Sequence, residues 1–413
     1  MKKEFKKVCV VGLGYIGLPT SAIFASRGID VIGVDINQSV VDTINRGDIH
    51  IVEPDLDVIV KKVVVDKKLL ASTEPESADA FLIVVPTPFK GENHEPNLDY
   101  IKAASESVAR VLKKDDLIVL ESTSPVGTTE KLSYWLAQER KDLTFPHQAG
   151  EDSDIKIAYC PERVLPGYVV RELVENDRIL GGMTTISGKY AIELYKIFVK
   201  GECFLTNAKT AEMAKLTENA FRDVNIAFAN ELSILCDKIG IDVWELISLS
   251  NKHPRVNILN PGCGVGGHCI AVDPWFIVNA YPEESKLIRS AREVNDGKSD
   301  FVIHQIKKEI DRIGAKSIAC LGLSFKPDID DLRESPALKI VSKLADDIKI
   351  DILAVEPNIH TLPRILKEKI NIQLVSLELA IREADLIVIL VRHREFENMK
   401  RVGCISFVDR VLD

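Results

Sequence analysis

The chain has 413 residues, 46% of them hydrophobic and 28% charged, which predicts a folded globular protein of two or three domains. Its net charge of −9 opposes non-specific binding to nucleic acid. No apolar run approaches the roughly 18 residues that cross a bilayer. We therefore expect a cytoplasmic protein with neither nucleic acid nor a membrane as its partner.

The cysteines argue against both disulfides and a metal site. The eight cysteines show no CxxC pair and no framework spacing, as expected in a reducing compartment. His268 and Cys269 are sequence neighbours, and no HxxxH or CxxC pattern accompanies them. We expect no metal ligand set.

Three buried-strand patterns occur near the N-terminus, with helix-like stretches between them. They are VCVVGLGYIG at 8–17, IDVIGVD at 29–35 and ADAFLIVVPTP at 78–88. Continuous apolar runs that alternate with helices are typical of a parallel sheet covered on both faces. This part of the chain is predicted to form a Rossmann-like unit.

The first strand runs directly into a glycine motif. Gly12, Gly14 and Gly17 form GxGxxG at the head of a predicted helix, and Asp35 ends the next strand, 18 residues after Gly17. The glycines permit a tight turn, close approach of a pyrophosphate and close helix packing. Asp35 would accept hydrogen bonds from ribose hydroxyls and repel a 2′-phosphate, which favours NAD over NADP. A purely structural turn is the competing interpretation.

Two segments supply charged side chains that an anionic ligand requires. YCPERVLPG at 159–167 places Glu162 and Arg163 after a strand, and HPRVN adds His253 and Arg255. Because the whole chain is acidic, such local bases are informative.

One long helix is predicted at 208–240. Apolar side chains recur at helical spacing until Gly240 ends the pattern, and the helix would span roughly 45 Å. It would serve as a buried connection or as a face for a partner subunit, and we favour dimerisation. Lys215, Asn219 and Arg222 form a polar stripe that either faces water or stabilises an oxyanion.

A glycine-rich loop precedes one cysteine. In NPGCGVGGHCIAVDPWF, Cys269 follows Gly264, Gly266 and Gly267, and Asp273 lies four residues after Cys269. If Cys269 begins a helix, the thiolate would be favoured and Asp273 would share its face. Taken alone, such a cysteine is more often structural than catalytic.

The C-terminal part repeats the N-terminal pattern, with SIACLGLSFKP, IDILAVEP and ADLIVILVRH. Only Gly322 survives of the three glycines, so a second dinucleotide is not expected. Lys326 lies where a strand leads into a loop and suits a phosphate. Arg333 and Glu334 follow, with a solvated charge run as the alternative. The predicted fold is α/β, with two Rossmann-like doubly wound parallel-sheet domains joined by a long central helix.

Seven motifs occur together and in order across essentially the whole chain. They are GLGYIGLP, VPTP, ESTSPVGTT, CPERVLPG, EMAKLTEN, GVGGHCIAVDP and FKPDIDDLRESP. With this set, the chain resembles the UDP-glucose/GDP-mannose dehydrogenase family. The resemblance implies an NAD-binding domain at 1–205, a central helical dimerisation and catalytic region at 206–314, and a UDP-sugar-binding domain at 315–413.

The resemblance also implies a reaction, the four-electron oxidation of a sugar C6 alcohol to a carboxylate with two NAD and water. Cys269 would capture the aldehyde as a thiohemiacetal that becomes a thioester. Lys215 and Asn219 would stabilise oxyanions, and Glu162, Thr123 and Asp273 would order water and move protons. The residues implied to hold NAD are Gly12, Gly14, Tyr15, Ile16, Gly17, Asp35, Thr87, Thr123 and Arg333. The residues implied to hold the nucleotide sugar are Arg163, Val164, Lys215, Asn219, Arg222, His253, Arg255, Gly266, Phe325 and Lys326.

Within the family, three stretches favour UDP-N-acetyl-D-mannosamine as the substrate. They are 172–184, 221–232 and 253–277. UDP-N-acetylglucosamine and UDP-glucose remain alternatives, and a non-catalytic NAD-binding scaffold is a distant one. Cys263 stands where similar proteins often carry proline. It is either a neutral replacement or a partner in a reversible disulfide that switches off Cys269.

Overall fold

The computed structural model describes residues 3–91, 94–165, 167–397, 399 and 404–408. The chain divides into two compact units, Met1–Thr217 and Glu218–Asp413. Among the described residues, the helices are too short or too polar to traverse a lipid bilayer.

The first unit is built on an eight-stranded sheet in the order β10-β9-β8-β7-β4-β1-β2-β3. Neighbouring strands are parallel except β8 and β9, which are antiparallel. β1 lies between β2 and β4 and is parallel to both. Successive strands are therefore added first on one side of β1 and then on the other, and open α/β sheets bind ligands at such a switch point. The strands of this sheet are β1 (Lys7–Val11), β2 (Asp30–Val34), β3 (Leu69–Ser72), β4 (Ala80–Ile83), β7 (Leu117–Leu120), β8 (Lys156–Tyr159), β9 (Arg178–Gly182) and β10 (Cys203–Asn207).

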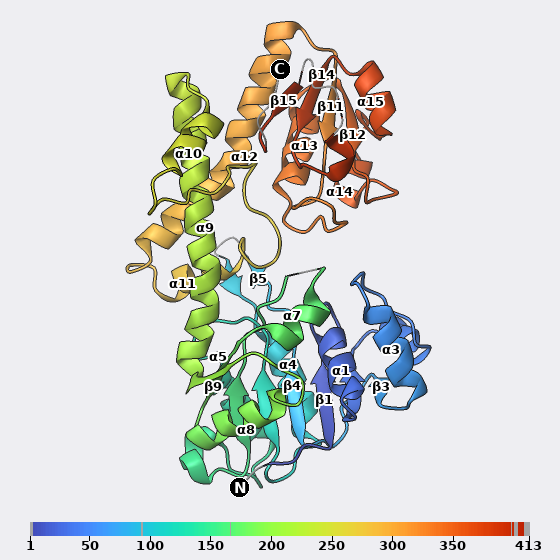
Figure 1. Cartoon of the computed structure of the whole chain (residues 1–413), viewed down its shortest axis with the longest axis vertical. Helices are drawn as coiled ribbons and strands as arrows, with labels where there is room; N and C mark the ends of the chain where they lie inside the picture. Colours follow the sequence, from blue (N-terminus) through green and yellow to red (C-terminus); the bar gives the residue numbers. More distant parts are fainter. Residues whose placement is uncertain (1–2, 92–93, 166, 398, 400–403, 409–413) are drawn as a thin grey trace. The chain divides into compact units, whose positions relative to one another are not determined.

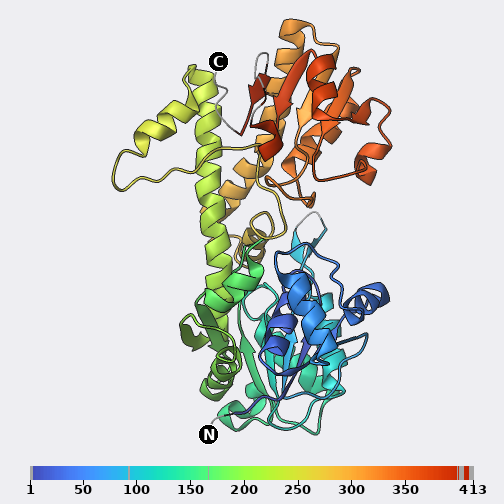
Figure 2. The ribbon, with the colours of Figure 1, turned by 45° about the vertical axis from the view of Figure 1, so that its right-hand side comes forward.

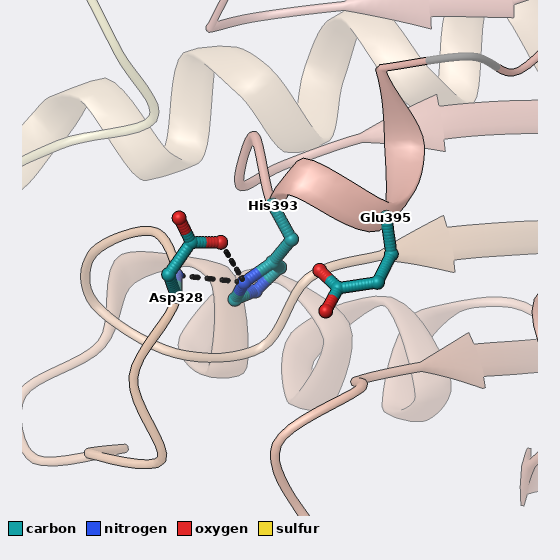
Figure 3. A group of neighbouring side chains, drawn as sticks. All are labelled: Asp328, His393 and Glu395. Carbon is teal, nitrogen blue, oxygen red and sulfur yellow. Dashed lines mark hydrogen bonds and ion pairs between the residues drawn. The ribbon is translucent and has the colours of Figure 1, made fainter.

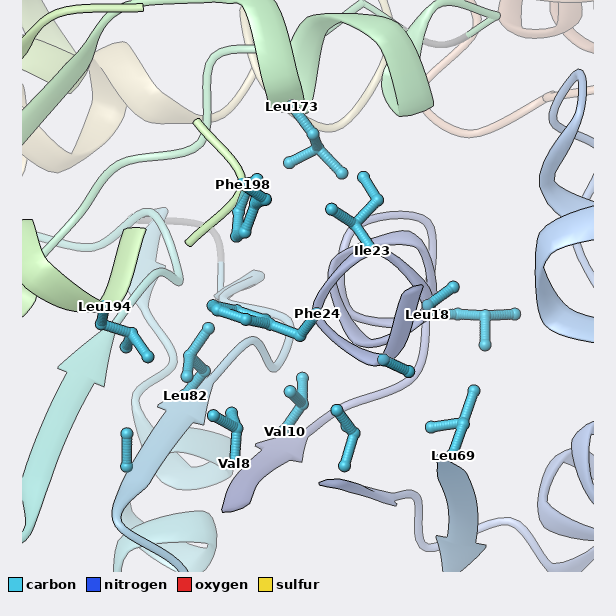
Figure 4. Close-up of a cluster of buried hydrophobic side chains, with 14 of the residues drawn as sticks. Val8, Val10, Leu18, Ile23, Phe24, Leu69, Leu82, Leu173, Leu194 and Phe198 are labelled. Atoms are coloured by element: carbon cyan, nitrogen blue, oxygen red, sulfur yellow. The ribbon is translucent and has the colours of Figure 1, made fainter. Parts of the chain in front are cut away.

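Side chains along β1 alternate between two separate cores. Val8 and Val10 pack into one cluster, and Cys9 and Val11 pack into the other. Phe24 of helix α1 (Gly17–Ser26) lies in the first cluster, where its ring meets Phe198 edge to face with the ring centroids 4.7 Å apart (Figure 4). A sheet with an apolar core on each face requires helices on both faces, as the continuous apolar strands predicted.

Helices and one short hairpin complete the first unit (Figure 1). The hairpin consists of β5 (Phe89–Lys90) and β6 (Glu95–Pro96). The helices are α1 (Gly17–Ser26), α2 (Gln38–Asn45), α3 (Leu56–Val65), α4 (Asp99–Ala109), α5 (Thr128–Glu139), α6 (Pro146–Ala149), α7 (Val169–Glu175) and α8 (Thr185–Tyr195), with a 3-10 turn at Gly150–Asp152.

The predicted long helix is α9, Ala208–Ile239, which is unbroken in both views (Figures 1 and 2). It ends where predicted, because Gly240 takes the left-handed conformation with φ +79°. The amide groups of Gly240 and Ile241 both donate to the carbonyl of Cys236, which satisfies the last turn.

The second unit carries a five-stranded sheet, fully parallel, in the order β13-β12-β11-β14-β15. It too has an apolar cluster on each face. Its strands are β11 (Ser317–Leu321), β12 (Asp351–Val355), β13 (Ile372–Leu374), β14 (Leu386–Ile389) and β15 (Cys404–Ser406). Its helices after α9 are α10 (Val243–Ser250), α11 (Asp273–Ala280), α12 (Lys286–Ile313), α13 (Pro336–Asp347), α14 (Arg364–Lys367) and α15 (Leu377–Glu383), with a 3-10 turn at Arg394–Phe396.

The predicted internal repeat is confirmed. In each unit the first strand lies in the middle of the sheet and ends at a glycine with positive φ, Gly12 at +99° and Gly322 at +89°. A Cβ at Gly12 would lie 2.4 Å from the Val84 carbonyl oxygen, and a Cβ at Gly322 would lie 2.4 Å from Cβ of Val391. Both turns therefore require glycine for the same steric reason. The α/β fold with two parallel-sheet units and a long central helix is confirmed.

Candidate active site

The GxGxxG turn has the geometry that a dinucleotide requires. A Cβ on Gly17, the first residue of α1, would lie 1.7 Å from the Gly12 carbonyl oxygen, so this glycine permits the close approach of helix and turn. A Cβ on Gly14 would meet nothing within 4 Å. Gly14 is exposed, and it leaves open the space in which a pyrophosphate approaches the helix N-terminus.

Asp35 follows β2, and its carboxylate is held beside the glycine turn. Its Oδ2 accepts from the amide of Leu13 at 3.1 Å, and its Oδ1 accepts from the amide of Asn37 at 2.9 Å. The carboxylate is half-buried and fixed by the backbone of the turn itself. A ribose hydroxyl that reached this edge would find an ordered acceptor, so the residues present fit the adenosine half of NAD.

The loops after β4 and β7 are tied together at the same edge of the sheet. The hydroxyl of Thr87 donates to the carbonyl of Thr123, and the hydroxyl of Ser122 donates to the carbonyl of Val85 at 2.7 Å. Thr87 and Thr123 were both expected in the cofactor site, and the structure brings them into contact. Tyr15 and Ile16 were also expected there and belong to the glycine turn. Tyr15 is 38% exposed, and Ile16 is half-buried.

Glu212 of α9 is a buried residue that the sequence analysis missed. Its carboxylate accepts from the amides of Gly127 and Thr129 at 2.6 and 2.7 Å, at the N-terminus of α5. A carboxylate that caps a helix N-terminus is stabilised by the helix dipole. The start of α9 is therefore anchored to the loop of the ESTSPVGTT motif.

Lys215 and Glu162 are in contact, through the backbone of the glutamate. Nζ of Lys215 donates to the Glu162 carbonyl at 2.7 Å. The Glu162 carboxylate accepts from its neighbour Arg163 N at 2.7 Å and forms an ion pair with Arg178 at 2.5 Å. Arg178 is only 2% exposed and was missed, although a charged residue at the start of the apolar run RILGG was a visible signal.

Asn219 and Asp273 are joined by a buried hydrogen bond. Nδ2 of Asn219, one turn after Lys215 on α9, donates to Oδ2 of Asp273 at 2.5 Å. The amide of Asp273 donates to the carbonyl of Cys269 at 2.8 Å, and the amide of Val272 donates to the same oxygen at 3.1 Å. The condition that Cys269 begins a helix is not met, because α11 begins at Asp273. Cys269 instead opens the tight turn that leads into α11, and it is half-buried.

The glycine loop before Cys269 packs against the FKPDIDDLRESP segment. A Cβ on Gly266 would lie 2.6 Å from the Glu334 carbonyl oxygen, and a Cβ on Gly267 would lie 2.8 Å from the Phe325 ring. The amide of Gly267 donates to the carbonyl of Arg333 at 3.2 Å. Two expected substrate residues, Gly266 and Phe325, are thus neighbours close to Cys269, and the glycines are needed for this approach.

A buried polar network holds the other end of the same loop. Asn230 of α9 accepts from the amide of Gly262 at 2.9 Å and donates to Asn295 of α12 at 2.8 Å. Asp223 and Arg292 form an ion pair at 2.7 Å, and the two side chains are 0% and 1% exposed. Breaking such a buried pair is costly, because one charge remains uncompensated. These residues were missed, although Asp223 and Asn230 lie on the long helix that the sequence predicted.

Six of the expected substrate residues differ in their exposure. Arg222, His253 and Arg255 are exposed, whereas Arg163, Val164 and Lys326 are half-buried. The side chain of Arg333 forms an ion pair with Asp331 at 2.6 Å.

Cys263 belongs to the hydrophobic core of the second unit. It is 5% exposed, and its thiol lies 3.5 Å from the Leu390 carbonyl. Burial raises the pKa of the Cys263 thiol to about 12. A thiol in this environment is inert toward disulfide exchange, which needs the thiolate, so the geometry favours the neutral replacement over the redox switch.

Asp328, His393 and Glu395 form a cluster with the elements of a metal site (Figure 3). His393 is fully buried, however, and its Nδ1 accepts from the amide of Asp328 at 2.9 Å while its Nε2 contacts Glu356 at 3.0 Å. Both ring nitrogens are occupied, which leaves no lone pair for a metal ion. The cluster is a structural clamp.

Glu356 is the counterpart of Asp35 in the second unit. It follows β12 and accepts from the amide of Leu323, directly after Gly322, at 2.7 Å. Its carboxylate also contacts His393 and accepts from Asn358. Because His393 and Asn358 bind the buried carboxylate of Glu356, this carboxylate is not open to a ribose hydroxyl as the half-buried Asp35 is.

We predict that Gly14→Ala weakens NAD binding by about tenfold or more, since the new methyl group enters the space of the pyrophosphate. The variant should melt at the wild-type temperature, because the methyl group meets no protein atom within 4 Å. Gly17→Ala is the matched control and should fail to fold, as its Cβ would collide with the Gly12 carbonyl. Calorimetric NAD titration and thermal melting check both. Wild-type NAD affinity in a folded Gly14→Ala would contradict this assignment.

Three family models match consecutive parts of the chain. They describe the NAD-binding, central and UDP-binding domains of the UDP-glucose/GDP-mannose dehydrogenase family and match residues 6–199, 209–297 and 319–408. The chain is 69% identical to the UDP-N-acetyl-D-mannosamine dehydrogenase of Campylobacter jejuni, over 98% of this chain and 99% of that protein. It is 61% identical to the NDP-N-acetyl-D-galactosaminuronic acid dehydrogenase of Ralstonia nicotianae, over 96% of this chain and 93% of that one.

The solved structures agree with the sequence relatives. The UDP-D-ManNAc dehydrogenase of Pyrococcus horikoshii superposes with a TM-score of 0.88 at 39% identity, covering 98% of this chain and 95% of that one. Together with the glycine turn and Asp35, these matches establish the coenzyme as NAD. The chain belongs to the UDP-glucose/GDP-mannose dehydrogenase family and is an NAD-dependent nucleotide-sugar dehydrogenase.

Proposed function

We propose that the enzyme oxidises the C6 hydroxymethyl group of UDP-N-acetyl-D-mannosamine to a carboxylate, through a covalent bond to Cys269. The product, UDP-N-acetyl-D-mannosaminuronate, would be made in the cytoplasm and would serve as a precursor of a surface polysaccharide. The observation that carries the mechanism is the turn at Cys269, which the Asn219–Asp273 bond ties to α9. The 69% identity to a relative with this activity supports the sugar.

The reaction balances as one alcohol, one water and two NAD⁺ giving one carboxylate, two NADH and three protons. NAD supplies the hydride acceptor for both oxidations. After the first oxidation, the Cys269 sulfur adds to the aldehyde carbon and forms a thiohemiacetal. The second oxidation gives a thioester, and water then cleaves its C–S bond and returns the thiol. The bound aldehyde is not released between the steps.

The side chains on α9 stabilise negative charge on the substrate oxygen. The ammonium of Lys215 has three donors, of which the Glu162 carbonyl takes one, and it supplies a positive charge. The amide of Asn219 is held by Asp273 and supplies a neutral donor one turn later. Fixed donors lower the barrier most when they need no reorganisation as charge develops.

Water activation is assigned to Glu162, Thr123 and Asp273. Asp273 is 3% exposed and anchored by Asn219, and Thr123 is half-buried in the loop after β7.

We assign NAD binding to residues 1–205, catalysis and dimerisation to 206–314, and UDP-sugar binding to 315–413. Arg163, Val164, Arg222, His253, Arg255, Gly266, Phe325 and Lys326 would hold the nucleotide sugar, and Arg333 would contact NAD.

One relative favours a second candidate substrate. At 61% identity, a protein named for N-acetyl-D-galactosaminuronic acid falls within the 57–69% range of the mannosamine dehydrogenases. Oxidation at C6 is common to these sugars, which differ in ring stereochemistry. UDP-N-acetylglucosamine and UDP-glucose belong in the same comparison.

We predict that two NADH form for each UDP-N-acetyl-D-mannosamine consumed, measured by absorbance with limiting sugar, and that kcat/KM is lower for the other UDP-sugars.

Cys269→Ser should lower the rate of carboxylate formation by at least about a thousandfold, because the thioester cannot form. Its NAD affinity should stay at the wild-type value. Full turnover by Cys269→Ser would refute the covalent step, and a preference for another sugar would correct the substrate.

We also propose that α9 forms a dimer interface with a second copy of the chain. Phe221, Phe228 and Leu235 recur at heptad spacing on α9 and are 68%, 51% and 47% exposed. An apolar stripe of this kind is typical of a helix that packs against a partner.

Light scattering should therefore give a dimer, or a larger assembly of dimers, at micromolar concentration. Phe228→Glu should shift the mass toward the monomer, because it places a charge in the apolar stripe. Val65→Glu on α3, where the side chain is 74% exposed, is the control and should leave the mass unchanged. A monomeric wild-type protein would rule out this interface.

A further inference from the structure

A buried cluster of charged and polar side chains lies behind Glu162. Glu121 follows β7, Arg178 begins β9 and Tyr195 ends α8, and these three are 3%, 2% and 0% exposed. The hydroxyl of Tyr195 donates to Oε1 of Glu121. Arg178 pairs with Glu162 through Nη1 at 2.5 Å and donates to the Leu173 carbonyl through Nη2 at 3.0 Å.

The cluster holds two carboxyl groups but a single guanidinium. Arg178 forms its ion pair with Glu162, whereas the Glu121 carboxyl group accepts a hydrogen bond from the hydroxyl of Tyr195. Oε2 of Glu121 and Nε of Arg178 are both buried and make no hydrogen bond within the described part of the chain. An acceptor and a donor are thus both unsatisfied in the same buried cluster, which is costly.

Glu121 is the group of this cluster that titrates near neutrality. Burial, followed by repulsion from Glu162, raises the pKa of Glu121 to about 7. Besides Glu162 and Arg178, the titratable groups that face it are Tyr195 and Cys160, and burial raises the pKa of each further above neutrality. Arg178 stays charged. A change of charge near pH 7 therefore belongs to Glu121.

We propose that Glu121 is a positioning residue, whose ionised carboxylate competes with Glu162 for Arg178 and so frees Glu162 to hold the hydrolytic water. With neutral Glu121, Arg178 keeps the Glu162 carboxylate in an ion pair. When Glu121 ionises, the unsatisfied Nε of Arg178 is the donor that can compensate it, and the hold on Glu162 weakens. This inference rests on the proposed function, which assigns Glu162 to water activation.

Glu121→Gln is the test, because glutamine keeps the shape and the acceptor for Tyr195 but cannot ionise. The ratio of wild-type to variant kcat should rise with pH through about 7 and reach about tenfold above pH 8, with little change in KM. Glu139→Gln, which removes an exposed carboxyl at the end of α5, is the matched control and should give a flat ratio. A ratio for Glu121→Gln that is the same at every pH would indicate a merely structural role and overturn the proposal.

A second measurement needs no substrate. A carboxyl whose pKa is raised on folding contributes stability at low pH, and this contribution is lost as pH rises through the folded value of about 7. The Tm of the wild type should therefore fall by several degrees relative to Glu121→Gln between pH 5 and pH 8. An unchanged difference in Tm would overturn the inference alone. A wild type that forms no NADH with any UDP-sugar would instead overturn the proposed function.

Discussion

The hydrogen bond between Asn219 and Asp273 is the constraint on which the proposed chemistry depends. It joins α9 to the first residue of α11, and the amide of Asp273 in turn binds the carbonyl of Cys269. The thiol therefore sits at the start of a turn that is closed by two backbone bonds and anchored to a 32-residue helix. A nucleophile gains most from being held in place, since ordering it during the reaction would cost entropy. Asn230 of the same helix binds the amide of Gly262 in the preceding glycine loop, and the Asp223–Arg292 pair joins that helix to α12.

The two Rossmann-like units share one fold but differ at the acid that follows the second strand of each sheet. Each has a glycine turn after its central strand and an acid after the next strand that accepts an amide of that turn. In the first unit, Asp35 remains half-buried beside the exposed Gly14. In the second unit, Glu356 is buried and engaged by His393 and Asn358. The difference lies in one histidine and in lost glycines, and it explains why a repeated fold need not repeat its ligand.

Much of the fold followed from the sequence, because its strongest signals are local. Apolar runs, glycine turns and the uninterrupted pattern of α9 predicted three strands in each sheet and the long helix. The GxGxxG turn and Asp35 were equally readable, because the glycine spacing and an acid at the end of the next strand form a recognisable pattern. The start of α11 was less readable, because Cys269 and Asp273 share a tight turn rather than the first turn of the helix.

The residues that sequence reasoning missed act across long separations. Arg178 meets Glu162 across a loop and a helix, Glu212 caps a helix 83 residues earlier, and Arg292 pairs with Asp223 at a separation of 69 residues. Nothing in the local spacing of these residues indicates a partner. Arg178 alone carries a local signal, a charge at the start of the apolar strand RILGG, which indicates burial with a partner without identifying it.

The most direct test of the account is to capture the covalent intermediate. The enzyme is mixed with NAD and the UDP-sugar, quenched in acid within the first turnover and digested, and the cysteine peptides are weighed by mass spectrometry. The account predicts that the peptide with Cys269 carries the mass of the acylated nucleotide sugar, whereas the peptide with Cys263 is unmodified. An adduct on another residue, or turnover with Cys269 unmodified at every quench time, would contradict it.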